Sequence, residues 1–268
     1  MKDGHVHSPY CPHGSNDDFE DYIKNAIEVG LTEITFTEHL PLPNGFVDPS
    51  HEKDSAMKIE SIECYIDTVK KLKERYRDKI KINAGVEVDY LEGYEEEIKY
   101  ILDKYGPDLD DSIISVHMIN VGGKYCLIDY SVEEFGKLIS ILNGVGNVYT
   151  KYYQTIKNAI DSDLGEYKPK RIGHLNIVRK FNQVFPYDYS NNLLLEEIVK
   201  SIKENGYEVD YNIAGYRKEE CKEAYISGEL LDLIEKYEIP MVLGSDSHQA
   251  KDIKCYKSIS GIENKSLK

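Results

Sequence analysis

The chain has 268 residues, a length ordinary for one α/β barrel and sufficient to bury a large core without disulfides. Hydrophobic residues make up 41 % of the chain and charged residues 30 %, which is typical of a soluble globular protein. The formal net charge is −15 and no basic stripe accompanies it, so we expect no nucleic-acid partner. No stretch is apolar enough to span a bilayer, which argues against a membrane partner.

Cysteine usage and the N-terminal residues indicate where the protein resides. The five cysteines are an odd number and show no CxxC spacing, which favours reduced thiols and a cytoplasmic location. The N-terminus lacks the apolar core of a secretory signal. No linker, repeat or low-complexity tract divides the chain, so residues 1–268 are expected to form a single domain.

Seven short segments have the β-branched and apolar character of strands. In chain order they are Gly4–Ser8, Glu33–Thr37, Ile80–Val88, Ser112–Val116, Arg171–Leu175, Glu208–Asn212 and Pro240–Gly244. Helical patterns between them include Asp17–Val29, a helix opened by the capping box Ser131-x-x-Glu134, Asn191–Glu204 capped by Ser190, and Ser227–Tyr237, with a loop expected at Gly144–Asn147. This alternation predicts a parallel sheet, either closed as a barrel or open and doubly wound. No GxGxxG follows the first strand, which weakens a dinucleotide-binding interpretation.

Histidines concentrate at the carboxyl ends of the predicted strands. Six of the eight lie within or directly after a strand and a seventh lies in the loop after the first strand, namely His5, His7, His39, His117, His174, His248 and the loop residue His13. Two carboxylates join them, because Glu87 ends the third strand and Asp246 follows the seventh. The carboxyl ends of barrel strands meet on one face, so these nine side chains should converge on one mouth. His51 follows no strand and is expected outside the group.

This set of donors predicts a metal centre. A lone histidine at a strand end is more often a satisfied polar side chain than a ligand, so it is the convergence that indicates metal binding. Imidazole and carboxylate together suit zinc, iron and manganese. Nine donors are more than one ion coordinates, so the predicted cofactor is two to three divalent metal ions per chain, with Glu87 able to bridge two of them.

Two arginines are expected on the same face as the histidines. Arg179 follows the fifth predicted strand and Arg217 follows the sixth. A guanidinium matches phosphate oxygens bidentately, so both are candidate substrate-binding residues. A surface or salt-bridged role is the open alternative for each.

Taken together and in order, the motifs resemble those of the PHP (polymerase and histidinol phosphatase) superfamily. They are His5-Val6-His7, His13, Thr37-Glu38-His39, Gly85-Val86-Glu87, Ser115-Val116-His117, Gly173-His174-Leu175 and Ser245-Asp246-Ser247-His248, which span nearly the whole chain. The resemblance implies the PHP fold, a distorted seven-stranded TIM-like (β/α)7 barrel, with a trinuclear metal site.

Flanking residues resemble the histidinol-phosphatase branch of that family. They include Cys11-Pro12-His13-Gly14, the segment from His174 to Lys180 and the segment from Tyr211 to Lys218. The branch implies a metal-dependent phosphomonoesterase that hydrolyses L-histidinol phosphate in histidine biosynthesis, so the expected partner is a small-molecule phosphate ester. Asn176, Asp210 and Ile213 depart from the residues expected at their positions, which puts fine substrate detail in doubt but spares every expected ligand.

The resemblance also implies a role for each residue. One ion would be held by His5, His7, Glu87 and Asp246, a second by Glu87, His117 and His174, and a third by His13, His39 and His248. Arg179 and Arg217 would bind the phosphate, and Arg217, Asp246 and His248 are the implied catalytic residues.

Three alternatives stay open. A PHP nuclease or a phosphoesterase with another substrate would share the ligands, although this chain lacks a basic track. A metal-dependent amidohydrolase would use a similar barrel without needing the two arginines. A non-catalytic metal-binding protein would have a coordinatively closed cluster, whereas catalysis needs an open position.

Overall fold

Seven parallel strands form the centre of the molecule in the computed structural model, which describes residues 1–258 and residue 267. The strands are β1 (Lys2–Val6), β2 (Glu33–His39), β3 (Lys81–Asp89), β4 (Ile113–Ser115), β7 (Arg171–Ile172), β8 (Glu208–Asn212) and β9 (Met241–Gly244). They pair in the order in which they occur along the chain, from β1 to β9. Almost every residue of these strands is buried, as expected for a parallel sheet covered by helices.

The two outer strands of the sheet meet at their carboxyl ends. The amide of Asp246 donates to the carbonyl of His5 at 2.8 Å, and the amide of His7 donates to the carbonyl of Ser247 at 3.1 Å. Val6 and Ser247 form a parallel bridge at the same place. The sheet is therefore a nearly closed barrel, which confirms the predicted distorted seven-stranded α/β barrel and excludes the open sheet.

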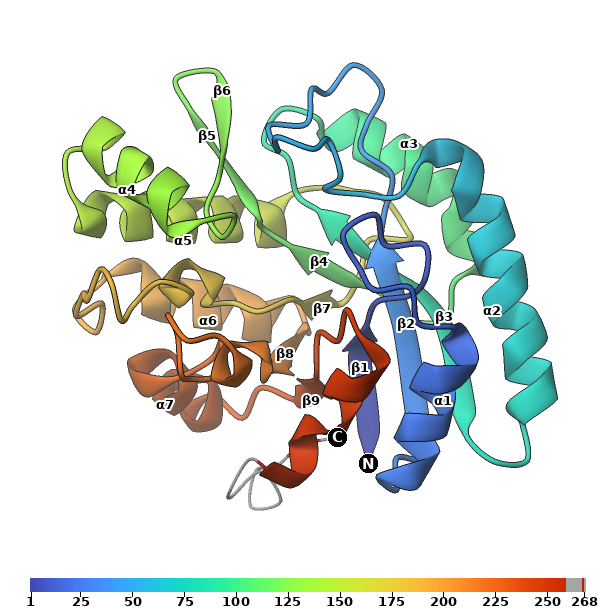
Figure 1. Ribbon diagram of the computed structural model, residues 1–268. Coiled ribbons are helices and arrows are strands. Elements are labelled where there is room, and N and C mark those ends of the chain that lie inside the picture. Colours follow the sequence, from blue (N-terminus) through green and yellow to red (C-terminus); the bar gives the residue numbers. More distant parts are fainter. Residues whose placement is uncertain (259–266, 268) are drawn as a thin grey trace.

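In the part of the chain that the structure describes, seven α-helices follow the strands around the barrel (Figure 1). They are α1 (Phe19–Glu28), α2 (Ile62–Tyr76), α3 (Glu95–Tyr105), α4 (Val132–Ile141), α5 (Val145–Asp161), α6 (Leu194–Glu204) and α7 (Gly228–Lys236). Figure 1 shows α1 to α3 beside the first strands and α4 to α7 beside the later ones. Each helix buries one apolar stripe; in α1 the stripe is Phe19, Tyr22, Ile23 and Ala26.

The structure differs locally from the predicted elements. Ser131 caps α4 as predicted, with its Oγ accepting from the amide of Glu134 at 3.1 Å, whereas Ser190 does not cap α6, whose N-cap is Leu193. The expected loop at Gly144–Asn147 is wrong, because α5 already begins at Val145. An antiparallel hairpin of β5 (Met118–Val121) and β6 (Lys124–Leu127) was not predicted and projects beside the carboxyl end of β4 (Figure 1). Among the described residues, no helix is long and apolar enough to cross a membrane.

A half-buried ion cluster lies around Asp111, in the loop before β4. The Oδ2 atom of Asp111 accepts from Lys2 Nζ at 2.8 Å, Thr35 Oγ1 at 3.0 Å and Arg171 Nη2 at 2.9 Å. Arg171 is only 2 % exposed, so its guanidinium depends on this carboxylate for its counter-charge. Burial raises the pKa of Asp111, but Arg171 and Lys2 outweigh that effect and lower the pKa below its ordinary value.

Replacing Asp111 by asparagine is expected to lower the free energy of unfolding at neutral pH by about 3 kcal/mol, because it leaves the buried Arg171 unpaired. Urea unfolding would measure the loss. The folded-state pKa of Asp111 is lowered, so its contribution is present above the unfolded-state pKa and is lost as the pH falls through the folded-state value. The gap between wild type and variant should therefore narrow in acid.

The exposed Asp108 provides a matched control. Its carboxylate pairs with Lys70 while remaining 55 % exposed, and such surface pairs contribute about 0.5 kcal/mol or less. If Asp108→Asn and Asp111→Asn lower the free energy of unfolding equally, the cluster around Asp111 contributes no more than a surface ion pair.

Candidate metal centre

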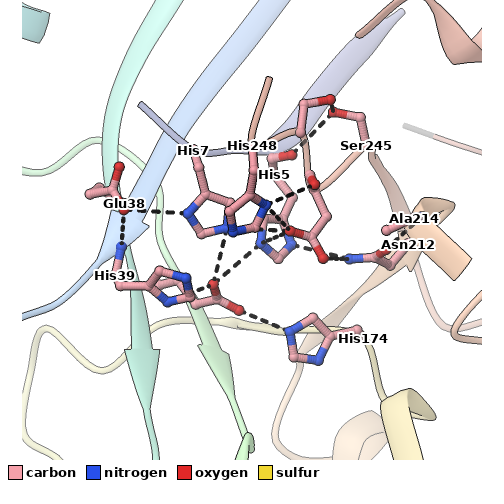
Figure 2. A network of polar contacts seen from close by, with 12 residues as sticks. His5, His7, Glu38, His39, His174, Asn212, Ala214, Ser245 and His248 are labelled. Carbon is pink, nitrogen blue, oxygen red and sulfur yellow. Dashed lines mark hydrogen bonds and ion pairs between the residues drawn. The ribbon is translucent and has the colours of Figure 1, made fainter. Parts of the chain in front are cut away.

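The nine predicted metal ligands all lie at the carboxyl end of the barrel. His5 belongs to β1, His39 ends β2, Glu87 belongs to β3, and the others follow strand ends: His7, His13, His117, His174, Asp246 and His248. Figure 2 shows the labelled histidines from β1, β2 and the loop after β9 facing one another, with His174 at the edge of the group. The structure therefore brings together all nine residues that the strand-end pattern selected.

Glu87 is the centre of the cluster and is 1 % exposed. Its Oε2 atom lies 3.4 Å from His5 Nε2, 3.4 Å from His7 Nε2 and 3.2 Å from His39 Nδ1. Its Oε1 atom lies 2.9 Å from His174 Nε2 and 3.7 Å from His117 Nε2. One carboxylate thus faces five imidazoles from the ends of four strands, an arrangement suited to bridging metal ions.

A second group of carboxylates contacts the Nδ1 atoms of three imidazoles, on the side of each ring that faces away from Glu87. Nδ1 of His5 lies 2.7 Å from Asp210, Nδ1 of His117 lies 2.6 Å from Asp89, and Nδ1 of His7 lies 3.4 Å from Glu38. A carboxylate accepts the Nδ1 proton and leaves Nε2 as the free donor atom, which is the tautomer that a metal ligand needs.

Several buried donor atoms have no hydrogen-bond partner within the described part of the chain. They are Nε2 of His5 and His7, both ring nitrogens of His39, Nδ1 of His174 and Oε2 of Glu87. A buried polar atom without a partner is costly, so these atoms point to a ligand. Four sets of side chains have ligand atoms within 4.8 Å of one another, including His5 with His7 and Glu87, and Glu87 with His117 and His174. The residues fit divalent metal ions.

The pKa shifts of one carboxylate and two imidazoles suit metal binding. Burial raises the pKa of Glu87, but the imidazoles of His5 and His117 hold it well below its ordinary value. Burial and the neighbouring His7 hold the pKa of His39 and of His248 well below the ordinary value, so both rings are neutral donors. Ionised carboxylates and neutral imidazoles are the protonation states in which these groups bind metals.

Asp246 has an unusual backbone conformation, with φ at +52°. Asn212 Nδ2 donates to its carboxylate at 3.2 Å, and Arg217 Nη2 donates to its carbonyl at 3.1 Å and to that of Ser245 at 2.9 Å. Gly244 precedes this turn, and a Cβ there would lie 2.0 Å from Asp210 Oδ1. A non-glycine residue held in the left-handed region at such a site indicates that aiming the carboxylate outweighs the strain.

A pocket with a volume of about 380 Å³ adjoins the cluster. His39, His117, Asp246 and His248 line it, so this side of the cluster is accessible. Three cations also line the pocket, Lys180, Arg217 and Lys218, together with three carboxylates, Asp54, Asp129 and Asp252. The pocket therefore combines a metal site with groups of both charges.

Arg179 lies apart from these residues, contrary to its predicted phosphate-binding role. Its guanidinium pairs with Glu223, donates to the carbonyl of Tyr187 and lies 4.7 Å from the ring of Tyr189. It lines a separate surface pocket rather than the one beside the histidines. His51 also lies outside the cluster, exposed beside Glu134, as expected.

Five further residues at the site do not follow from the strand-end pattern of histidines: the carboxylates Glu38, Asp89 and Asp210, and the cations Lys180 and Lys218. A signal was available for the carboxylates. Glu38 precedes His39, Asp89 lies two residues after Glu87 on the same face of β3, and Asp210 lies on β8. No comparable spacing distinguishes the two lysines from surface lysines.

Comparisons with known proteins agree with this geometry. The profile of the PHP domain family matches residues 3–214. The histidinol-phosphatase of Bacillus subtilis (strain 168) is 45 % identical over 254 residues, which cover 94 % of this chain and 95 % of that protein. A crystal structure of a candidate histidinol phosphatase from Listeria monocytogenes has a TM-score of 0.92 and 33 % identity, covering 96 % of this chain and 99 % of that one.

A more distant structure has the same fold. The histidinol phosphate phosphatase of Lactococcus lactis, solved with zinc, L-histidinol and phosphate, has a TM-score of 0.73 and 20 % identity, covering 96 % of this chain and 91 % of that one. The family profile and the near full-length relatives agree on the family of this chain. The chain belongs to the PHP domain family, in its histidinol-phosphatase branch.

Proposed function

We propose that this protein is a metal-dependent histidinol-phosphatase, which hydrolyses L-histidinol phosphate to L-histidinol and phosphate in histidine biosynthesis. The observation that carries the proposal is the pocket, in which a histidine and carboxylate cluster lies beside three cations. The relative from Bacillus subtilis with 45 % identity supports the substrate. The Lactococcus lactis enzyme, which was solved with zinc, L-histidinol and phosphate, supports it further.

The metal centre of this proposal has two to three divalent ions per chain, of zinc, iron or manganese. We assign the first to His5, His7, Glu87 and Asp246, the second to Glu87, His117 and His174, and the third, called the outer ion below, to His13, His39 and His248. The unpartnered buried nitrogens of His5, His7 and His39 support this assignment.

Bound divalent ions would polarise the phosphoryl oxygens and lower the pKa of a water molecule, which supplies the nucleophile. The residues of the chain bind and orient the substrate. Lys180, Arg217 and Lys218 attract the phosphate to their side of the pocket. Asp129 and Asp54 give the cationic part of the substrate a favourable environment. Asp246 and His248, whose Oδ1 and Nδ1 atoms lie 3.4 Å apart, are the proposed proton carriers. They would take the proton that the attacking water gives up and pass it to the leaving alcohol.

The function is tested by offering four substrates to the metal-loaded enzyme. They are L-histidinol phosphate, an aryl phosphate, single-stranded DNA and a cyclic amide. The highest kcat/KM is expected for L-histidinol phosphate, and removal of metal with a chelator should abolish turnover. A preference for the aryl phosphate would end the specific assignment but keep a phosphatase. Cleavage of DNA or amide would favour a nuclease or an amidohydrolase, and no turnover of any substrate would favour a non-catalytic metal-binding protein.

Arg217→Ala is expected to lower kcat/KM for L-histidinol phosphate roughly 10- to 100-fold, mainly through a higher KM. The loss of one charged hydrogen bond to phosphate has about this effect. Metal content should stay intact, because Arg217 contacts the backbone oxygens of Ser245 and Asp246, the Cys255 thiol and the Asp252 carboxylate, none of which is an assigned ligand atom. Steady-state kinetics and elemental analysis would measure both effects.

Arg179→Ala is the matched control, because Arg179 pairs with Glu223 outside the pocket. It should leave kcat/KM unchanged and lower thermal stability. If turnover and KM of Arg217→Ala equal those of wild type, Arg217 does not bind the substrate.

A further inference from the structure

Cys11 lies in the loop that connects β1 to α1, and its side chain is buried with 6 % exposure. The amide of Cys11 donates to the carbonyl of Ser8 at 3.0 Å, and its own carbonyl accepts from the amide of Gly14 at 3.1 Å. The loop is tied to the metal centre, because the amide of Ser15 donates to the carbonyl of His248 at 2.9 Å. This turn directs the thiol inward.

The thiol of Cys11 belongs to one of the candidate ligand sets. Its sulfur and one ring nitrogen each of His7, His39 and His248 all lie within 4.8 Å of one another. The imidazole rings are closely packed here, with centroids 4.3 Å apart for His7 and His39 and 3.9 Å apart for His7 and His248. Cys11 is thus the fourth donor of this set and its one sulfur, beside three imidazoles, and none of the assignments above uses it.

Two imidazoles of the outer ion direct their Nε2 atoms toward each other. Nδ1 of His13 donates to the carbonyl of Asp54 at 2.8 Å, and Nδ1 of His248 donates to the carbonyl of Asp246 at 3.3 Å. The remaining ring nitrogens, Nε2 of His13 and Nε2 of His248, lie 3.1 Å apart, and one ion between the rings would take both as ligands. His39 adds two buried nitrogens that have no hydrogen-bond partner among the described residues.

We propose that Cys11 is a sulfur ligand of the outer ion. It would hold the ion together with His39 and His248, which belong to its ligand set, and with His13, whose Nε2 atom lies 3.1 Å from that of His248. One sulfur and three nitrogen donors form a four-coordinate set that zinc favours. The thiol loses its proton to solvent when it binds the ion. Because thiolate is a soft ligand, Cys11 makes this position prefer zinc over manganese. The inference rests on the proposed metal centre and adds a ligand to it.

Cobalt(II) is the probe for sulfur coordination, since a thiolate bound to this ion gives a charge-transfer band in the near ultraviolet. The full-length protein is stripped of metal and reloaded with cobalt, and cobalt content is measured beside the spectrum. Wild type should show the band, and both Cys11→Ser and Cys11→Ala should lack it. Circular dichroism checks that the two variants are folded.

Two cysteines outside the cluster provide matched controls. Cys221 is as buried as Cys11 but lies beside the carbonyl of Glu223, and Cys64 is an exposed thiol that accepts from Tyr10. Cys221→Ala and Cys64→Ser should keep the band. A band that persists in Cys11→Ser, or that is missing from fully loaded wild type, would overturn the inference.

Metal competition gives a second measurement that does not depend on activity. After dialysis against equal zinc and manganese, Cys11→Ser should retain about one zinc per chain less than wild type, because the soft ligand is gone. Identical zinc contents would count against the proposal. A protein that takes up no zinc or cobalt at all would instead contradict the proposed metal centre, so the two failures are distinguishable.

Discussion

Replacing Glu87 by glutamine is expected to empty the metal centre and to lower kcat/KM roughly 1000-fold or more. Its two oxygens face five imidazoles, so a single carboxylate connects the ligands of two assigned ions. Glutamine keeps the shape of the side chain, but its amide nitrogen cannot bind a metal and its oxygen carries no charge. A metal ion contributes several kcal/mol to the transition state, and about 4 kcal/mol corresponds to a factor of roughly 1000.

Elemental analysis and steady-state kinetics of the same preparation would measure both losses. Glu92→Gln is a suitable control, because Glu92 is 37 % exposed and pairs with Lys151 at 2.9 Å outside the cluster. That variant should keep its metal and its activity. A Glu87→Gln enzyme with the metal content of wild type would show that Glu87 is not a required ligand.

The sequence predicts that these nine side chains converge, because their positions depend on the ends of strands. In a parallel barrel every strand points the same way, so a residue at the end of a strand is placed by the backbone alone. His39 is the last residue of β2, and Glu87 is its partner where β2 pairs with β3. An error in the predicted length of a strand does not change this placement. β7 has only two residues, fewer than predicted, yet the side chain of His174 still contacts Glu87 at the centre of the cluster.

The end of a strand does not predict where a side chain lies when its residue comes several positions later in the chain. Arg179 ends the short 3-10 turn Ile177–Arg179, and its guanidinium pairs with Glu223 rather than lining the pocket. Arg217 also ends a 3-10 turn, Ala214–Arg217, but it remains at the pocket and binds the carbonyls of the Asp246 segment. Loop geometry decides between these outcomes, and strand periodicity carries no information about it.

The carboxylates behind the imidazoles could be predicted only in part. Asp89 shares a face of β3 with Glu87, which the alternation of side chains along a strand makes foreseeable. The contact between Asp210 and His5 joins residues 205 positions apart, and it requires β1 to lie close to β8 across the barrel. Closure of the barrel, which no local pattern specifies, therefore completes the site.

Asp210→Asn is expected to weaken metal binding or activity roughly 10- to 100-fold, as is usual when the partner of a ligating histidine loses its charge. Asp210 is 1 % exposed, and its Oδ2 atom lies 2.7 Å from His5 Nδ1 and accepts from Asn212 Nδ2 at 3.0 Å. Against the effect of burial, Glu87, Asp210 and Asp246 together raise the pKa of His5 to about 10. Removing the charge of Asp210 makes the His5 ring a poorer donor.

Competition with a chelator would measure the metal affinity of Asp210→Asn. The same measurement on two further variants provides the comparison. Asp89→Asn removes the equivalent partner of His117, at 2.6 Å, and should weaken binding to a similar degree. Asp161→Asn makes the same chemical change at the end of α5, where the carboxylate accepts from Ser201 and Lys157, and should leave metal affinity unchanged. If Asp210→Asn behaves like Asp161→Asn, its contact with His5 does not tune the centre. If Asp210→Asn loses as much metal affinity as Asp89→Asn, the carboxylates that contact Nδ1 of His5 and of His117 contribute to metal binding on both sides of Glu87.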